Sequence, residues 1–438
     1  MMVQNVKKAT DFYKIQDATA SNIPVDEKHD FYVDFSEFRR SFQEKKIYRN
    51  LSINARTKEC TELVQPRKIF LSGYRGTGKT SELLKLNNAI DDTKCYFTIF
   101  VDISDEELDT NNIQTVDILI LMLEKLLEKL QNGGASIEDG IIESFYTWYS
   151  TRIEEVKTST SASVSIEAEV SASTSFLSFL KLTAKTKSQL KGSGESKETI
   201  RRVFNQHFSD FVTKFNEFIL TTKGKLQNSS SSYRDILFII DGFEKIGSYA
   251  DRKKILIEDS NKFTLIRTHM LITLPIELFN EMSILTNFGT ILRLPLIDLE
   301  LPGAKEKIKE FILKRVDRKL FKDEDTIDEI IQYGAGHPRQ TLQIISRAYT
   351  VADEDILDLK SVKDAVQEIG QELSSLNQDE MQILQDIKND KTPSATDAYI
   401  RLKEKNILFE YSDEKIHSIN PVLESSSLFQ KRLESLDA

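Results

Sequence analysis

The sequence predicts an α/β fold built around a parallel β-sheet. Short apolar runs alternate with helical patterns from Arg67 onward, which is the order of strand and helix that gives a parallel sheet. Hydrophobic residues make up 39% and charged residues 29% of the chain, as in a globular protein. Four runs have the continuous apolar character of strands buried on both faces: "KIFLSG" (68–73), "CYFTIFVDI" (95–103), "DILFIIDG" (235–242) and "HMLITLPI" (269–276).

The 438 residues are enough for two or three domains. We expect a mixed N-terminal segment of helices and loops (1–66), followed by the sheet-containing core (67–300). A charged helical lid is expected over 301–370, because the chain becomes helical after Pro302. The last part, 371–438, reads as two helices followed by two short strands around an "SDEK" turn, which is the order of a winged helix.

A long insertion interrupts the core between the second and third predicted strands. No strand-like run occurs over 103–230, and we expect helices near 113–131, 137–157 and 196–222. Two helices leading to a polar tip indicate an arm that projects from the core.

The tip of this insertion, 158–195, is rich in Ser, Thr and Ala. It alternates at period two, which predicts a hairpin or an extended tip, through Val164, Ile166, Ala168 and Val170. A disordered linker is the alternative, because such a composition buries little apolar surface. The "FLSFL" cluster at its centre would be an exposed contact surface, formed by Phe176, Leu177, Phe179 and Leu180.

The net charge and the two cysteines indicate which partners, metal sites and cellular location to expect. The net charge of −10 argues against non-specific nucleic-acid binding over the whole surface, although a local basic patch is compatible with it. Cys60 and Cys95 lie far apart in the sequence without a nearby His cluster, so we expect neither a disulfide framework nor a zinc site. A reducing, cytoplasmic location follows. The most apolar helix is too charged to span a bilayer, and we expect no membrane contact.

A glycine-rich loop directly follows the first predicted strand. Gly73, Gly76, Gly78, Lys79 and Thr80 fit the pattern G-x-x-x-x-G-K-[ST], with a strand before it and a helix after it. Backbone N–H groups of such a loop and the helix N-terminus attract phosphate oxygens. The lysine reaches the β- and γ-phosphates and the Thr80 hydroxyl is a ligand for Mg²⁺. The sequence therefore predicts a site for ATP and Mg²⁺.

The remaining residues of the loop complete the predicted cofactor site. Tyr74, Arg75 and Thr77 lie between the glycines, and Ser81 opens the following helix. We assign all four to nucleotide binding together with the motif residues. An ordinary glycine turn is the alternative.

Two carboxylates follow the third strand. Asp241 ends the apolar run 236–240, and a carboxylate at the tip of a buried strand beside the phosphate loop serves as the second group on the metal. Glu244 lies three residues on and could orient the attacking water as a general base. A strand-ending "DG" turn and a surface glutamate at a helix start are the alternatives.

Three further residues are candidates for contact with the nucleotide. Thr273 ends the fourth strand and would face the γ-phosphate, unless it is only a strand-end threonine. In "GAGHPRQ" two glycines end one helix and Pro338 begins the next, which puts Arg339 in the first turn, where it would point to the nucleotide or to solvent. His337 has no base partner in view, and we treat it as structural.

Taken in order, these motifs resemble the AAA+ and STAND groups of P-loop ATPases. The resemblance covers about 67–438, the insertion excepted. It implies a parallel-sheet ATPase with a helical lid and a C-terminal winged helix, in which ATP binding drives a conformational change or oligomerisation. By resemblance, 73–80 is the Walker A loop, Asp241 the Walker B aspartate and Thr273 the first sensor. Pro338 and Arg339 match the second-sensor position.

Two departures from the AAA+ pattern favour a slow switch. Gly242 follows Asp241 where AAA+ machines usually carry glutamate, and "DGFE" is closer to the STAND form. No arginine finger is assigned, because Arg252, Arg267 and Arg293 are equivalent candidates. The combination of "VDFSEFR", the loop followed by "SEL" and a long helical insertion resembles bacterial STAND-type ATPases, some of which serve in phage defence.

Two functions follow from this pattern. The first is an ATP-binding, slowly hydrolysing switch that self-associates or changes conformation to engage a separate effector protein, since no effector motif is visible in the chain. The alternative is a DNA-binding AAA+ ATPase of the origin-recognition or transposition type. From Gln371 onward, eight Lys and Arg face thirteen Asp and Glu, which favours a protein partner over DNA. The basic lid stretch "KEKIKEFILKRVDRKLFK" supports the DNA alternative.

Overall fold

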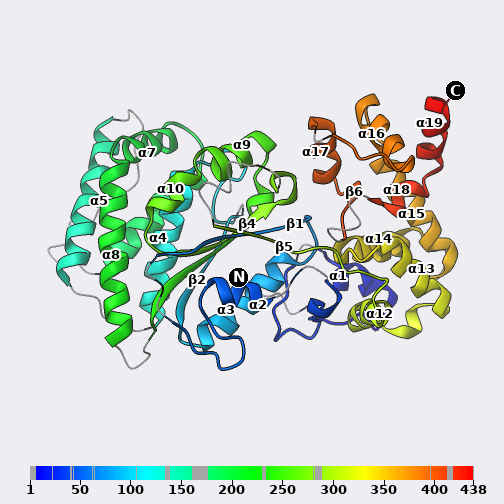
Figure 1. The fold of residues 1–438 in the computed structure, drawn as a ribbon, viewed down its shortest axis with the longest axis horizontal. Coiled ribbons are helices and arrows are strands. Elements are labelled where there is room, and N and C mark those ends of the chain that lie inside the picture. Colours follow the sequence, from blue (N-terminus) through cyan, green and yellow to red (C-terminus); the bar gives the residue numbers. More distant parts are fainter. Residues whose placement is uncertain are drawn as a thin grey trace.

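A computed structural model of the chain describes residues 6–437, except 22, 40–41, 43, 62, 64, 105, 134–138, 160–175, 229–232, 280, 282–288, 395 and 412–417. A five-stranded sheet lies at its centre, with the helices of the insertion on one side of the molecule and the C-terminal helices on the other (Figure 1). The strands are β1 (Lys68–Gly73), β2 (Tyr96–Asp102), β3 (Asp235–Asp241), β4 (His269–Pro275) and β5 (Thr290–Arg293).

The sheet has the order β2-β3-β4-β1-β5, and every neighbouring pair is parallel. This confirms the predicted fold class and the four predicted strands. The fifth strand was missed, because it is only four residues long and half-buried at the sheet edge. Parallel pairing brings the ends of β1, β2, β3 and β4 to one edge of the sheet, where ligand sites of α/β proteins form.

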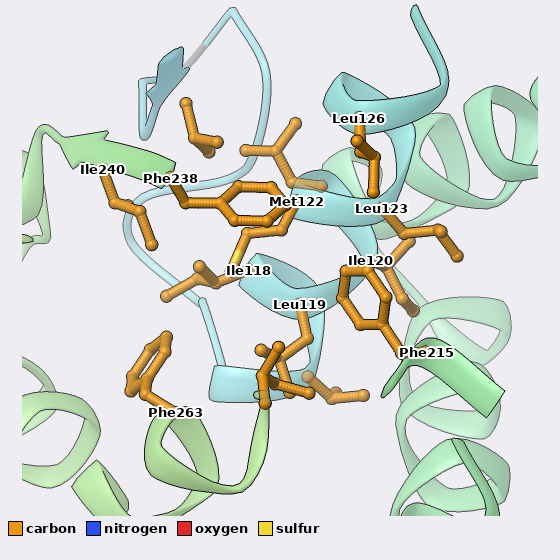
Figure 2. Packing of buried hydrophobic residues seen from close by; sticks show 14 of the residues in the cluster. Ile118, Leu119, Ile120, Met122, Leu123, Leu126, Phe215, Phe238, Ile240 and Phe263 are labelled. Carbon is orange, nitrogen blue, oxygen red and sulfur yellow. The ribbon is translucent and has the colours of Figure 1, made fainter. Parts of the chain in front are cut away.

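The insertion consists of helices that share the main hydrophobic core with the sheet. They are α4 (Thr115–Asn132), α5 (Asp139–Ser159), α6 (Phe176–Lys191), α7 (Glu195–Gln206) and α8 (Phe208–Asn228). Figure 2 shows Met122 and Leu123 of α4 packed near Phe238 of β3 and Phe215 of α8. The prediction of a projecting arm is therefore wrong for these helices, because their apolar faces pack continuously with β2 and β3.

The "FLSFL" cluster is not an exposed contact surface. It begins α6, and Phe179 is fully buried with its ring 5.1 Å from that of Phe145. Leu177 is half exposed, whereas Phe176 and Leu180 pack partly against the core. The predicted tip thus ends where α6 begins, because these apolar residues follow a helical period. The alternation through Val164 to Val170 lies outside the described residues.

The N-terminal segment packs with the lid rather than standing apart. It contains 3₁₀ turns and short helices: η1 (Phe12–Lys14), α1 (Ile15–Ala18), η2 (Ser36–Phe38) and α2 (Glu44–Asn50). Phe12 and Ile15 share one core with Ile308 and Ile345 of the lid. The lid comprises α12 (Ala304–Arg315), η6 (Arg318–Leu320), α13 (Glu324–Gly334), α14 (Pro338–Val351) and α15 (Leu359–Leu373).

The C-terminal module, residues 376–437, has a small core of its own. It contains α16 (Gln378–Lys388), α17 (Asp397–Glu404), the antiparallel pair β6 (Leu408–Phe409) and β7 (Ser418–Ile419), α18 (Pro421–Glu424) and α19 (Ser427–Asp437). Two helices followed by two paired strands match the predicted order of elements. The "SDEK" turn between the strands lies outside the described residues.

The remaining helices follow the core strands: α3 (Lys79–Asp92), η3 (Phe243–Lys245), α9 (Tyr249–Lys253), the π-helix η4 (Lys254–Glu258), α10 (Ser260–Leu265) and η5 (Ile276–Leu278). No helix within the described residues is long and apolar enough to cross a membrane.

Cys60 and Cys95 form a disulfide, contrary to the expectation of two separate thiols. The loop after α2 returns to the start of β2, which brings the two residues to a Cα–Cα distance of 5.7 Å despite their separation in sequence. The inference of a reducing location from unpaired cysteines therefore loses its basis.

Candidate functional site

The phosphate loop connects β1 to α3 at the carboxyl edge of the sheet. Gly76 and Gly78 both have φ of +94°, a region that L-residues with side chains rarely adopt. A Cβ at Gly76 would also lie 2.6 Å from the Cβ of Arg339. The glycines are thus required both by the loop conformation and by the close approach of the lid.

Lys79 lies under the loop, almost fully buried. Its ammonium donates to the carbonyl oxygens of Gly73 and Tyr74, each at 2.9 Å. The same nitrogen lies 3.7 Å from Oε1 of Glu244. A buried cation held by carbonyls at the N-terminus of a helix is suited to bind polyphosphate oxygens.

Thr80 and Asp241 meet as the sequence predicts. The Thr80 hydroxyl donates to Oδ2 of Asp241 at 2.5 Å, and Asp241 is fully buried. Burial, and then the charge of Glu244, raise the pKa of Asp241 to about 6. Its other oxygen, Oδ1, has no hydrogen-bond partner among the described residues.

These two oxygens fit a magnesium ion. Mg²⁺ prefers hard oxygen ligands and takes few from protein when phosphates supply the rest. The orphaned Oδ1 of Asp241 and its raised pKa both indicate a carboxylate that a cation would stabilise. Thr80 and Asp241 would therefore hold Mg²⁺ together with the nucleotide, and the ion would neutralise charge on the phosphates.

The structure gives a reason for the glycine that follows Asp241. Gly242 has φ of +100°, and a Cβ there would lie 2.2 Å from the carbonyl oxygen of Ile103. No glutamate fits at this position without moving β2. Glu244 in η3, two residues further on, lines the same cavity as Lys79. Burial works against ionisation of Glu244, but the charge of Lys79 prevails and lowers its pKa.

Thr273 lies within the sheet rather than on the cavity wall. It pairs with Leu71 across β4 and β1, and it is fully buried. Its hydroxyl has no hydrogen-bond partner among the described residues. Pro275 and Ile276, two and three residues further on, line a smaller cavity beside Glu244. Contact between Thr273 and a γ-phosphate stays a prediction.

The lid reaches the phosphate loop through the start of α14. His337 caps this helix by accepting from the amide of Gln340 at Nδ1, and its Nε2 lies 3.0 Å from the carbonyl oxygen of Arg75. Burial lowers the pKa of His337 to about 3, so the ring is neutral and Nε2–H donates to that carbonyl. His337 is structural, as the sequence suggested.

Pro338 and Arg339 line the cavity, as predicted. Arg339 is half-buried, and its pKa is lowered by burial and then by the charge of Arg75. Its guanidinium makes no hydrogen bond or ion pair within the described part of the chain. Two guanidiniums that repel one another beside Lys79 form an environment that an anion would stabilise.

Unlike Arg75 and Thr77, Tyr74 of the phosphate loop does not line the cavity. Its side chain is buried away from the cavity and contacts Phe409 of the C-terminal module, with the ring centroids 5.8 Å apart. Its assignment to nucleotide binding is therefore corrected, because only its backbone carbonyl takes part, as an acceptor for Lys79. Arg75, Thr77 and Ser81 line the cavity as predicted.

The cavity over the loop has a volume of about 520 Å³. Much of its wall comes from the N-terminal segment, including Val25, Phe31 and Phe35. The sequence analysis did not predict this contribution, although "VDFSEFR" is one of the stretches that carry the STAND resemblance. The Arg39 that ends this motif is buried and donates to the carbonyl of Thr77 at 2.6 Å, which braces the phosphate loop.

Contacts within the chain separate the three arginine-finger candidates. Arg252 is buried and pairs with Glu277 at 2.9 Å and with Glu404. Arg293 pairs with Glu410 at 2.6 Å. Both are thus held within the chain. Arg267 is exposed in the turn before β4, at the sheet edge opposite the phosphate loop.

The glycine loop, Lys79 and the Thr80–Asp241 pair meet at the edge of a parallel sheet, which is the arrangement of a P-loop nucleotide site. No protein-family model matches the sequence, and no curated protein matches it.

Among solved structures, the chain is similar to the Walker-type ATPase PABY2304 of Pyrococcus abyssi (TM-score 0.43, 15% identity, covering 94% of this chain and 99% of that one). It is also similar to the Aeropyrum pernix Orc1 protein in complex with DNA (TM-score 0.37, 10% identity, 97% and 98%). A third likeness is to Cdc6p from Pyrobaculum aerophilum (TM-score 0.33, 12% identity, 92% and 99%). At these identities the likenesses concern the fold alone.

Proposed function

We propose that the protein is a slowly hydrolysing ATP switch of the AAA+ or STAND type, in which the nucleotide controls the docking of the C-terminal module. The observation that carries the proposal is a junction at one carbonyl group of the phosphate loop. The carbonyl oxygen of Arg75 accepts from Nδ2 of Asn406 in the C-terminal module at 3.1 Å and from His337 in the lid. Arg75 of the phosphate loop thus contacts both the lid and the C-terminal module.

The C-terminal module contacts both the lid and the core. On the lid, Asn420 and Gln340 exchange hydrogen bonds at 2.7 and 3.1 Å, and the Tyr411 hydroxyl donates to the carbonyl of Ala335. On the core, Glu404 pairs with Arg252 and Glu410 with Arg293.

A movement of the lid would therefore break one of these two sets of contacts. The lid already contacts the loop through Arg339 and His337, and a triphosphate bound by Arg339 in the first turn of α14 would reorient the lid there. The module follows the lid through Asn420 and Tyr411, so its ion pairs with the core open. ATP binding thus loosens the module from the core.

Slow hydrolysis fits the arrangement of Glu244. Its carboxylate lies near Lys79, which keeps it ionised and able to accept a proton from water. It also lines a second cavity of about 180 Å³, together with Arg75 and Arg252. Glu244 lines both this cavity and the one over the loop, so it can contact a water that lies between them. We infer that Glu244 is the general base and that turnover resets the switch.

The released module is proposed to engage a protein. The basic residues of α17 are paired with acids in the docked state: Arg401 and Lys405 with Glu380, and Lys403 with Glu410. Self-association and a separate effector protein are the partners expected for a switch of this type, including those of bacterial antiphage systems.

DNA binding of the origin-recognition or transposition type is the second candidate. The lid stretch 304–322 carries eight Lys and Arg against three Asp and Glu. Five of these cations pair with acids, which weakens the patch: Lys307, Lys309, Lys314, Arg318 and Lys322. Gel-shift titration of a duplex at two salt concentrations tests it, because phosphate contacts give a steep loss of affinity with salt.

The experiment that tests the main proposal combines calorimetry with mass photometry. Wild-type protein is expected to bind ATP with Mg²⁺ and to change assembly with a non-hydrolysable analogue. Lys79→Ala is expected to weaken ATP binding by more than about 100-fold, since a charged hydrogen-bond donor to phosphate is lost. Lys254→Ala is the control, because this lysine is exposed on η4. Equal ATP affinity in both variants would show that Lys79 does not bind the nucleotide.

A further inference from the structure

The cavity above the phosphate loop has a second wall of different character. Val25, Phe31 and Phe35 of the N-terminal segment face Phe311 and Leu342 of the lid. The rings of Phe35 and Phe311 lie 5.6 Å apart in an edge-to-face arrangement. Apolar and aromatic lining with few polar groups is typical of the part of a site that holds a flat organic ring.

A buried cation lies within this apolar wall. Arg315 ends α12, is 5% exposed and lines the cavity. Its guanidinium carbon lies 4.0 Å from the centroid of the Phe311 ring and 4.9 Å from that of Phe31. Both rings thus fix the plane and position of the guanidinium through cation–π contact.

The hydrogen bonds of Arg315 leave donors unused. Nη1 donates to the carbonyl oxygens of Phe31 at 3.0 Å and Phe311 at 3.2 Å. A guanidinium carries five N–H donors, and its Nε and Nη2 make no hydrogen bond to any described residue. No carboxylate of the described chain pairs with Arg315, and burial alone lowers its pKa to about 9, so the group is charged at neutral pH. Such a group is costly to bury without a partner.

We propose that Arg315 recognises the nucleobase by donating its free N–H groups to an acceptor atom of the purine ring. The inference rests on the proposed nucleotide site and adds the residue that distinguishes a nucleotide from a bare polyphosphate. The phosphates occupy the loop at one side of the cavity and the base lies among the phenylalanines at the other. For ATP the acceptor is a ring nitrogen of adenine, because a guanidinium offers only donors and adenine carries no exocyclic oxygen.

The test compares ATP with inorganic tripolyphosphate, both with Mg²⁺, by calorimetry on the full chain. Arg315→Met keeps an apolar side chain of similar length between the two rings but removes the donors. We expect its ATP affinity to fall about 10- to 100-fold, as for loss of a charged hydrogen bond. Its affinity for tripolyphosphate should change less than about two-fold. Arg318→Met is the matched control, since Arg318 lies on the same lid and pairs with Glu324 at its exposed side.

Unchanged ATP affinity in Arg315→Met would overturn the proposal, and so would an equal loss of ATP and tripolyphosphate. If wild-type protein binds neither ligand, the nucleotide site itself is wrong, which separates the two failures. Should Arg315→Met melt well below the wild type, Arg315→Lys provides the second variant. It keeps the charge but not the fork of donors, and an ATP affinity equal to that of the wild type would again contradict the assignment.

Discussion

The helical insertion and the C-terminal module are attached to the core in different ways. The insertion shares one apolar core with β2 and β3, and its contacts include the buried rings of Phe179 and Phe215. The module has its own core, and it packs on the lid through Val422 and beside the phosphate loop through Phe409. Its contacts with the sheet domain include ion pairs and hydrogen bonds, such as those of Glu410 and Asn406. Apolar packing is lost only on unfolding, whereas polar contacts exchange for water at modest cost. We therefore infer that the insertion is a fixed part of the fold and that the module, together with the lid, can shift relative to the sheet.

The largest effect is expected in the insertion. Phe179→Ala removes a fully buried ring and should lower the free energy of unfolding by about 3–5 kcal/mol. Chemical denaturation measures this change. Leu177→Ala on the same helix is the control, because Leu177 is half exposed and its loss should cost less than about 0.5 kcal/mol. Equal, small effects of both variants would mean that α6 is loosely attached, as the module is.

The disulfide, like the insertion, should contribute to global stability and should not affect the opening of the C-terminal module. The bond between Cys60 and Cys95 closes a loop that contains β1, the phosphate loop and α3. The double variant Cys60→Ser, Cys95→Ser should lose about 4 kcal/mol of stability by the chain-entropy estimate. The opening of the C-terminal module should not change. A melting temperature that does not respond to the double substitution would contradict a formed disulfide.

A smaller, local effect is expected in the module. Glu410→Gln removes the charge that faces Arg293 and Lys403, which should favour undocking by about 2 kcal/mol, the scale of a charged hydrogen bond. Limited proteolysis between the lid and α17 should speed up, while global stability changes less. Glu372→Ala is the control, since its pair with Arg347 is exposed and worth little. If Glu410→Gln leaves the cleavage rate unchanged, the ion pairs do not hold the module.

The smallest expected effect is the change of Mg²⁺-dependent ATP affinity with pH. Asp241 has a folded-state pKa of about 6, above its ordinary value, so the folded apo protein binds its proton more tightly than the unfolded chain. Its contribution to stability is present at low pH and is lost as the pH rises through about 6. Mg²⁺ needs the ionised form, so Mg²⁺-dependent ATP binding should weaken up to about ten-fold per pH unit below 6. Titration at several pH values checks this, and a flat profile would exclude Asp241 as the metal ligand.

The phosphate site could be predicted from sequence because each of its parts has a signature in a short stretch of the chain. The loop 73–80 is local, and Asp241 and the glycine that follows it mark a strand end. In the sequence, Gly242 stands where AAA+ machines usually carry glutamate. The structure gives the reason, because the carbonyl of Ile103 leaves no room for a side chain there.

The other features depend on long-range contacts. Arg39 and Arg315 reach the cavity from opposite ends of the chain, so no spacing pattern relates them to the loop. Tyr74 lies within the motif but turns toward Phe409, which the motif does not reveal. The polar composition of 158–195 concealed the start of α6, because a few apolar residues at helical spacing decide its packing.

Hydrogen exchange with and without a non-hydrolysable ATP analogue and Mg²⁺ tests the coupling of nucleotide and module most directly. The account predicts faster exchange in α17 and β6 when the analogue is bound, and unchanged exchange in α4 of the insertion. Lys79→Ala should abolish the difference. Equal exchange of α17 and β6 in both states of the wild type, with ATP binding shown by calorimetry, would contradict it.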